Sequence, residues 1–111
     1  DGRDGTLIRV IRRLAAGHDP RVHNLSNELP IPRLLPLIEQ AHSMVSVDTG
    51  PAHAAAALGC PLVVMFGAAS PEKWRPIGPG RIALLGGERG AASRVADIPV
   101  DRVVAAWRSL A

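Results

Sequence analysis

Two short apolar runs flank an alanine-rich segment, and this arrangement restricts the fold more than any other feature of the sequence. Met44–Val47 and Leu62–Phe66 are mostly apolar and partly β-branched, which is typical of buried strands. Ala52–Leu58, followed by Gly59, is typical of a short helix with a glycine stop. Leu62–Phe66 contains no polar residue, as expected at the centre of a parallel sheet that is covered on both faces. The pattern therefore predicts strand, helix and strand within one α/β domain.

Further elements extend this pattern along the chain. Thr6–Ala16 predicts an amphipathic helix, and the short piece Arg21–Leu25 is a candidate strand. Pro30–Ala41 predicts a helix that its prolines confine to the second half or kink at the start. A third strand is expected at Arg81–Leu85 and a last helix at Pro99–Leu110. The core face of that helix is expected to consist of Val100, Val103, Val104, Trp107 and Leu110.

The composition excludes several classes of protein. A chain of 111 residues, 47% hydrophobic and 21% charged, is enough for one compact domain. The formal net charge is +3, but the basic residues are scattered and only 3% of residues are aromatic, so a nucleic-acid interface is not indicated. The single cysteine, Cys60, leaves no internal disulfide, fits a reducing compartment and is expected to be a buried structural thiol. No Cys/His cluster has the spacing of a zinc site.

The segment Val45–His53 carries the strongest candidate site. A buried strand ends here, a turn follows and a helix begins, so backbone N–H groups and the positive end of a helix dipole point at one place. Gly50 removes a side chain that would keep a phosphate from the backbone, and Thr49 and His53 can donate further hydrogen bonds. Asp48 is no phosphate ligand, but it can accept helix N–H groups, position His53 or accept sugar hydroxyls. The segment predicts an anion site, with an ordinary capped helix start as the alternative.

A second candidate is the Gly/Pro-rich loop Gly67–Gly80, which follows the second buried strand. Ligands of open α/β sheets bind at the carboxyl ends of the strands, where this loop begins. Ser70 and Pro71 resemble the start of a short helix, and the following Lys73–Arg75 offer charge and a flat apolar ring. A surface turn whose tryptophan packs on its own loop is the alternative interpretation.

Other chemistry is disfavoured by the absence of its motifs. Neither the dinucleotide-binding glycine motif nor the phosphate-binding P-loop occurs, which argues against a nicotinamide dehydrogenase and a P-loop NTPase. Ser43 and Ser46 do not stand in the turn of a serine hydrolase. His18, His23 and His42 have no paired ligand at useful spacing and are expected to be solvent or packing residues.

Four strings of the sequence carry a specific resemblance: Ser46–His53, Ala55–Pro61, Phe66–Gly67, and Ser70–Pro76 with Gly78. In this order and spacing they resemble glycosyltransferase family 9, whose best-known members are the ADP-heptose:lipopolysaccharide heptosyltransferases. The resemblance extends more weakly from Thr6 to the final helix. It implies a GT-B architecture, in which two Rossmann-like domains face each other across a cleft and the C-terminal one binds the nucleotide sugar. Residues 1–111 are expected to be most of that C-terminal domain, truncated and without the N-terminal acceptor domain.

The resemblance also implies a function for the intact protein. An inverting enzyme of this family would transfer heptose from ADP-heptose to the lipopolysaccharide inner core, in the bacterial cytoplasm at the inner face of the inner membrane. Alternatives are another nucleotide sugar used for a capsule or surface glycan, or a stand-alone nucleotide-binding module without activity. The catalytic base is expected in the missing domain, so no catalytic residue, metal or cofactor is assigned to this chain, which alone is expected to be inactive.

The binding residues are carried over from the resemblance position by position. Thr49, Gly50 and Pro51 match the turn that holds the diphosphate. His53 matches a histidine that faces the phosphates or sugar, and Asp48 matches the acidic residue at the donor site. Two departures are Ser70, where many members carry aspartate, and Ala54, where leucine is common. The expected nucleotide-sugar-binding set is Leu29, near the adenine, with Asp48, Thr49, Gly50, Pro51 and His53.

Overall fold

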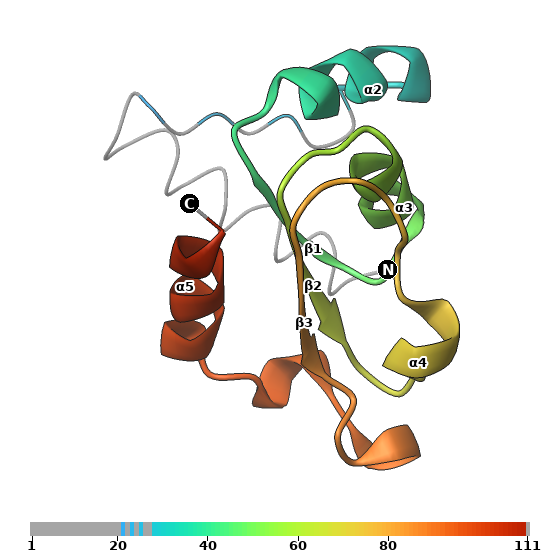
Figure 1. The fold of residues 1–111 in the computed structure, drawn as a ribbon, viewed down its shortest axis with the longest axis vertical. Coiled ribbons are helices and arrows are strands. Elements are labelled where there is room, and N and C mark those ends of the chain that lie inside the picture. Colours follow the sequence, from blue (N-terminus) through green and yellow to red (C-terminus); the bar gives the residue numbers. More distant parts are fainter. Residues whose placement is uncertain (1–20, 22, 24, 26–27, 111) are drawn as a thin grey trace. The chain divides into compact units, whose positions relative to one another are not determined.

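The computed structural model describes residues 21, 23, 25 and 28–110. The chain divides into two compact units, residues 1–33 and 34–111, and the fold described here is that of the second (Figure 1). In chain order the elements are α2 (Ile31–Gln40), β1 (Met44–Val47), α3 (Gly50–Ala57), β2 (Leu62–Phe66), α4 (Pro71–Trp74), β3 (Ile82–Gly86), the 3-10 turns Gly90–Ala92 and Val95–Asp97, and α5 (Val100–Ser109).

The three strands form one parallel sheet in the order β1-β2-β3. Met44 of β1 pairs with Leu62 of β2, which in turn pairs with Ile82 of β3. Helix α3 is the crossover that a parallel β1–β2 pair requires. All three arrows point the same way in Figure 1, so the carboxyl ends of the strands share one edge. The predicted α/β fold with a Rossmann-like parallel sheet is therefore confirmed.

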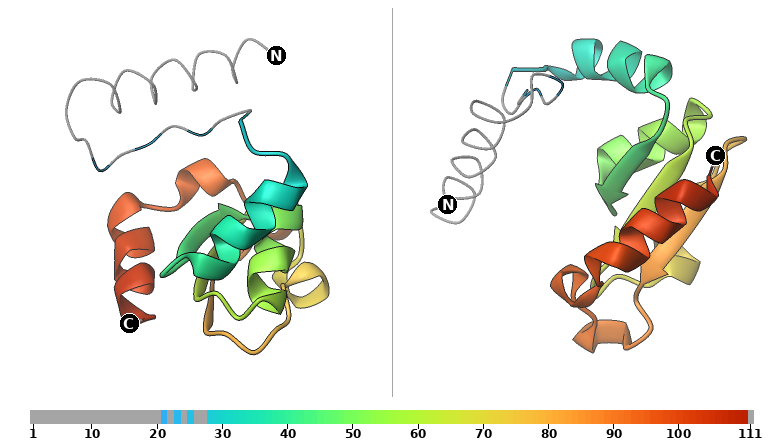
Figure 2. Two further views of the ribbon diagram at one scale, coloured as in Figure 1. Left: turned by 90° about the horizontal axis from the view of Figure 1, so that it is seen from above. Right: turned by 90° about the vertical axis from the view of Figure 1, so that its left-hand side faces the viewer.

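Strand β2 is buried from both sides, as its sequence predicts. The predicted burial of β1 was wrong: it is an edge strand with no buried residue, and Val45 and Val47 are 44% and 41% exposed. Leu62, Val64 and Phe66 of β2 are fully buried on the face covered by α2 and α3. Val63 points to the opposite face, where it packs with Leu85 and with α5. Figures 1 and 2 show α3 and α5 on opposite sides of the sheet. The cluster on the α3 face consists of Ile38, Ala52, Ala55, Ala56, Cys60, Leu62, Val64 and Phe66.

The buried face of α5 differs from the prediction. Val103, Ala106 and Leu110 pack towards the sheet, whereas Val100 is 78% exposed and Trp107 is 42% exposed. The apolar residues of this helix fit two neighbouring stripes, and periodicity alone does not choose between them. Trp107 lies on the flank of the helix, where its Nε1 donates a hydrogen bond to Ser43 Oγ at 2.7 Å. The predicted core positions Val100, Val104 and Trp107 were therefore wrong.

The N-terminal predictions have mixed outcomes. Helix α2 begins at Ile31 and continues past Pro36 to Gln40, so the prolines do not confine it to the second half of the predicted segment. Pro32 lies in the first turn, where a missing N–H breaks no intrahelical bond. Of the candidate strand, the described residues Arg21, His23 and Leu25 lie outside any strand. The predicted helix Thr6–Ala16 lies outside the described residues.

The close approach between the β2–β3 connection and α3 yields a stability prediction. A Cβ at Gly78 would overlap the backbone carbonyl of Ala56, which cannot move without disturbing α3. We expect Gly78→Ala to destabilise the fold by about 1–3 kcal/mol, the usual cost of overpacking. Gly50→Ala is the matched control, because a Cβ there meets nothing within 4 Å. Denaturant unfolding measures both, and equal stabilities would contradict the packing described here.

Candidate functional site

The site begins where β1 ends and α3 starts, as the sequence predicts. Asp48 and Thr49 connect the two elements, Gly50 is the first helical residue and Pro51 lies in the first turn. The first N–H groups of a helix have no intrahelical acceptor, and the helix dipole is positive at this end. The N–H of Gly50 is thus available to an anionic group.

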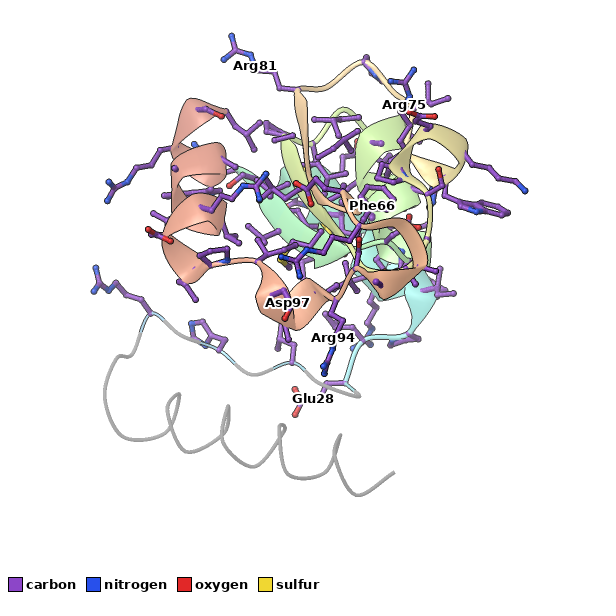
Figure 3. All side chains as sticks on the ribbon, turned by 90° about the horizontal axis from the view of Figure 1, so that it is seen from below. Glu28, Phe66, Arg75, Arg81, Arg94 and Asp97 are labelled. Atoms are coloured by element: carbon purple, nitrogen blue, oxygen red, sulfur yellow. The ribbon has the colours of Figure 1, made fainter. Side chains whose placement is uncertain are left out.

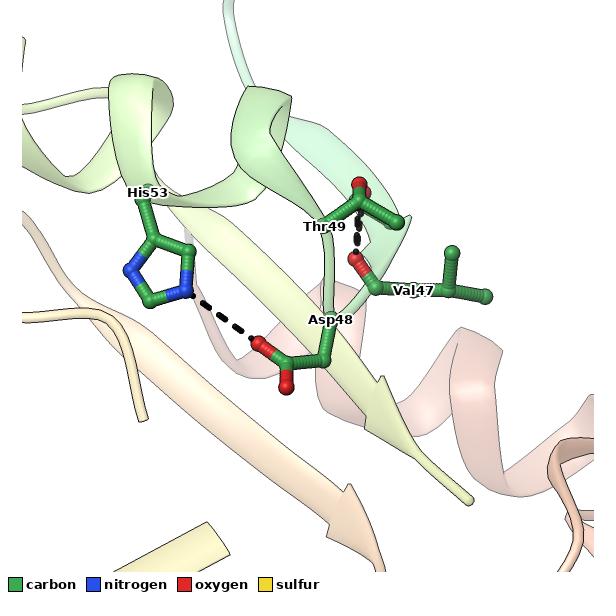
Figure 4. Close-up of polar contacts among 5 residues, drawn as sticks. Val47, Asp48, Thr49 and His53 are labelled. Carbon is green, nitrogen blue, oxygen red and sulfur yellow. Dashed lines mark hydrogen bonds and ion pairs between the residues drawn. The ribbon is translucent and has the colours of Figure 1, made fainter. Parts of the chain in front are cut away.

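The side chain of Thr49 does not cap the helix. Its backbone is extended at the cap position, with φ −140° and ψ 175°, but no side-chain bond to a helix N–H is formed. The Thr49 hydroxyl instead donates to the carbonyl of Val47 at 3.4 Å (Figure 4). Thr49 and Pro51 therefore occupy the cap and first-turn positions of the alternative interpretation, but the side-chain bond to a helix N–H is not formed.

Gly50 is not required by the fold itself. A Cβ added there would meet no atom within 4 Å, and Gly50 is not among the glycines with a left-handed backbone. An alanine would therefore fit without strain. The main consequence of glycine at this position is open space beside the unpaired N–H, which lets a ligand approach the backbone.

Asp48 contacts His53 across the turn. The distance from Asp48 Oδ1 to His53 Nε2 is 3.3 Å, and the two side chains are 15% and 47% exposed (Figure 4). Oδ1 is buried and has no aligned hydrogen bond, so the contact is one of charge and proximity rather than a well-formed hydrogen bond. Of the three predicted roles of Asp48, the structure supports the positioning of His53 and shows no bond to a helix N–H.

The second candidate, the loop after β2, splits into two parts. Ser70, Pro71 and Glu72 line an open cavity of about 650 Å³ together with Gly86–Glu88 at the end of β3. This cavity lies at the carboxyl edge of the sheet, where ligands of α/β folds bind. Trp74 is 52% exposed, and its ring centre lies 5.5 Å from Lys73 Nζ. The first part therefore faces the cavity, while Trp74 lies on the surface.

One ion pair near this cavity was missed by the sequence analysis. Arg102 donates to Glu88 Oε1 at 2.9 Å, joining the turn after β3 to α5. Hydrogen bonds from its own backbone and from Arg102 lower the pKa of Glu88. Both side chains are well exposed, so the pair contributes little stability. The partners are 14 positions apart in the sequence, and no local spacing indicates that they meet.

The remaining candidate residues are Leu29 and three histidines. Leu29 is half-buried and belongs to the unit formed by residues 1–33, so its role near an adenine stays a prediction. His42 contacts Ser43 and the ring of Trp107, His23 is exposed, and His18 lies outside the described residues. Within the part of the chain that the structure describes, no three His, Cys, Asp or Glu side chains form a metal cluster.

Cys60 is a buried thiol, as predicted. Its side chain is 4% exposed, and burial raises its pKa because the thiolate is desolvated. A smaller thiolate fraction at neutral pH means slow reaction with disulfide reagents. We expect the native thiol to react at least about tenfold more slowly than the thiol in denaturant, since the raised pKa and the burial act together. Titration with a chromogenic disulfide checks this, and equal rates would contradict it.

Comparisons with known proteins agree on one family. The sequence profile of glycosyltransferase family 9 (heptosyltransferase) matches residues 8–101, which include the whole turn from Asp48 to His53. Lipopolysaccharide heptosyltransferase 3 of Escherichia coli is 37% identical over 76 residues, which cover 68% of this chain and 22% of that protein. The matched part thus spans about a fifth of the length of that relative. No solved structure matches the chain.

Proposed function

The chain belongs to glycosyltransferase family 9, and from this we propose that it forms most of the C-terminal, nucleotide-sugar-binding domain of a GT-B enzyme. The activity proposed for the whole protein is inverting transfer of heptose from ADP-heptose to the lipopolysaccharide inner core. The name of the relative supports heptose and lipopolysaccharide as substrate classes. The observation that carries the donor site is the uncapped start of α3 beside the open space at Gly50.

The proposed chemistry of this chain is to hold the departing diphosphate. Negative charge develops on the leaving group as the glycosidic bond to the donor breaks, and preorganised donors stabilise that charge. The Gly50 N–H and the positive end of α3 serve this role, with the hydroxyl of Thr49 and the ring of His53 as further donors. Pro51 fixes the first turn of the helix, and Asp48 holds the ring of His53.

The other half of the reaction is assigned to another domain. A base must remove the proton of the acceptor hydroxyl, and we place that base in the acceptor domain of the whole protein. No catalytic residue is therefore proposed within residues 1–111, and this chain alone is proposed to bind donor without transferring sugar. Leu29 is proposed to lie near the adenine.

The proposed location follows from the acceptor. The name of the relative refers to lipopolysaccharide, and we propose that the whole protein works on that acceptor at the cytoplasmic face of the inner membrane. No described helix is long and apolar enough to cross a membrane. Association with the membrane would therefore rest, for these residues, on surface contacts.

Nucleotide titration tests the donor site directly. We expect the chain to bind ADP and ADP-heptose in preference to UDP and GDP by calorimetry. Thr49→Ala and His53→Ala should each weaken ADP binding by about tenfold, because each removes a hydrogen bond to a charged group. His42→Ala is the matched control, since His42 contacts Ser43 and Trp107 rather than the turn.

Gly50→Ala separates ligand binding from folding. Alanine suits a helix better than glycine by up to about 1 kcal/mol, so stability should be unchanged or raised. ADP binding should fall, because the methyl group enters the space beside the N–H. Selective binding of UDP or GDP would support a nucleotide-sugar-binding domain but would contradict ADP-heptose as its donor. A folded chain that binds none of the nucleotides would contradict a self-sufficient donor site.

A double-mutant cycle tests how Asp48 acts. If Asp48 works by holding His53, Asp48→Asn should weaken ADP-heptose binding in the native background and have little further effect when His53 is alanine. The expected coupling is about 0.5–3 kcal/mol, the usual range for residues in contact. The same cycle with His42→Ala should be additive within about 0.5 kcal/mol. Additivity in both cycles would mean that Asp48 acts independently of His53.

A further inference from the structure

A second, smaller cavity lies between the end of β3 and the start of α5. Its volume is about 280 Å³, which is below the about 300–1,000 Å³ of pockets that hold drug-sized molecules. The cavity therefore suits a small group rather than a nucleotide. We call it the arginine cavity, and its polar lining residues are Glu88, Arg89, Ser93, Arg94, Asp97 and Arg102.

The backbone around the arginine cavity is held by packing and hydrogen bonds. Gly86 and Gly87 have positive φ angles, which suit glycine, and a Cβ at Gly86 would overlap the carbonyl of Phe66. After this turn, the N–H of Gly90 donates to the carbonyl of Gly87 at 3.1 Å. At the other end of the segment, Ile98 packs against the core cluster on the α5 face. The cavity is thus formed by a segment that is fixed at both ends.

Ser93 provides a buried hydroxyl whose proton is unused. The residue is 9% exposed, and its Oγ accepts a hydrogen bond from the backbone N–H of Arg89 at 2.8 Å. A serine hydroxyl is a donor as well as an acceptor. Towards the other residues that the structure describes, the Ser93 hydroxyl donates no hydrogen bond. Its proton is therefore available to an acceptor atom in the arginine cavity.

The charged groups of the arginine cavity do not balance one another. Arg102 is paired with Glu88 at 2.9 Å. The guanidinium groups of Arg89 and Arg94 form no hydrogen bond or ion pair with any described residue, and the carboxylate of Asp97 forms none either. Figure 3 shows Arg94 and Asp97 on the segment between β3 and α5. Three guanidinium groups against two carboxylates leave the lining with a net positive charge.

The free donors of this lining match the acceptors of a phosphate group. A guanidinium group presents its N–H groups as a planar fork that fits phosphate oxygens, and the opposite charges strengthen each hydrogen bond. A phosphate monoester has three strong acceptor oxygens and carries a charge of about −1.5 to −2 at neutral pH. It can therefore accept hydrogen bonds from Arg89, Arg94 and Ser93 together, while Arg102 stays paired with Glu88.

We propose that the arginine cavity binds a phosphate group, either free or carried on a sugar. No lining residue belongs to the turn from Asp48 to His53. Strand β2 separates β1 from β3, so the ends of these two strands lie about 10 Å apart. The site is thus distinct from the proposed donor site, and the inference does not depend on nucleotide binding.

Amide NMR of the 111-residue chain tests the proposal, because each N–H reports on its own surroundings. Inorganic phosphate, titrated at constant ionic strength, should shift the amide signals of Arg89 and Ser93 to saturation. Arg89→Gln and Arg94→Gln should each weaken this binding about tenfold, since each removes a charged hydrogen-bond donor. Arg108→Gln is the matched control, because Arg108 lies on α5 and does not line the cavity. Its affinity should equal that of the unsubstituted chain.

Asp97→Asn should have the opposite effect. Removing a negative charge from the lining should strengthen phosphate binding about threefold, because the repulsion of the ligand is relieved. Arg89→Lys should retain part of the affinity, since lysine keeps the charge but lacks the planar fork. Weaker phosphate binding in Asp97→Asn would contradict an anionic ligand. The amide spectrum of each variant also shows whether its fold is intact.

Titrations with glucose 6-phosphate and glucose distinguish the two sources of phosphate. Tighter binding of glucose 6-phosphate than of inorganic phosphate would support a phosphorylated sugar as the ligand, and equal or weaker binding would support free phosphate. The proposal is overturned if inorganic phosphate causes no saturable shift at Arg89 and Ser93, or shifts only residues 48–53. Equal weakening in Arg89→Gln and Arg108→Gln, or binding of glucose as tightly as of glucose 6-phosphate, would overturn it as well.

Discussion

Burial of β2 between two layers of helix organises everything else that the structure describes. Its alternating side chains supply the core on both faces, with Leu62, Val64 and Phe66 towards α3 and Val63 towards α5. Burying a strand on both faces requires partners for its backbone on both edges, and β1 and β3 provide them in parallel. Parallel pairing in turn places all three carboxyl ends at one edge. Because the strands are parallel, the turn from Asp48 to His53 and the cavity at the end of β3 lie at the same edge of the sheet.

The small residues of α3 determine how the helix can be used. Ala52, Ala55 and Ala56 are fully buried, and they let the helix lie close to the sheet. The same lack of bulk lets the backbone of the β2–β3 connection pack on the end of the helix at Gly78 and Gly80. One short helix therefore has two distinct surroundings, an open N-terminus at the carboxyl edge and a tightly packed C-terminus. The proposed donor site lies at the open end.

The features that sequence analysis predicted correctly are those with local causes. Strands β1 and β2, the helix between them and its start at Thr49–Pro51 follow from β-branched runs, proline and glycine, whose effects act over a few residues. The buried face of α5 was wrong because it depends on where Val63 and Leu85 lie, which the helix sequence does not contain. The pairing of Glu88 with Arg102 likewise depends on the path of the chain between them.

The candidate site shows the same division. The residue types at Asp48, Thr49, Gly50 and His53 alone predict an anion site. Two details required the structure: the Thr49 hydroxyl bonds to Val47 rather than to the helix, and Asp48 contacts His53. Both concern side-chain rotamers, which short polar residues choose among several local hydrogen bonds of similar energy.

The costs carried by this turn are those expected of the proposed donor site. A helix start without a side-chain cap loses about 1 kcal/mol relative to a capped one. A buried polar atom without a hydrogen bond costs about 1–3 kcal/mol, and within the described residues Asp48 Oδ1 is such an atom. A threonine already stands at the cap position and could relieve the first cost by a change of rotamer, yet its hydroxyl bonds elsewhere. The uncapped N–H groups at the start of α3 and the Asp48 carboxylate, whose Oδ1 has no hydrogen bond, thus lie at the same turn. Proteins concentrate such local violations at functional sites, because a bound group satisfies there what the fold leaves open.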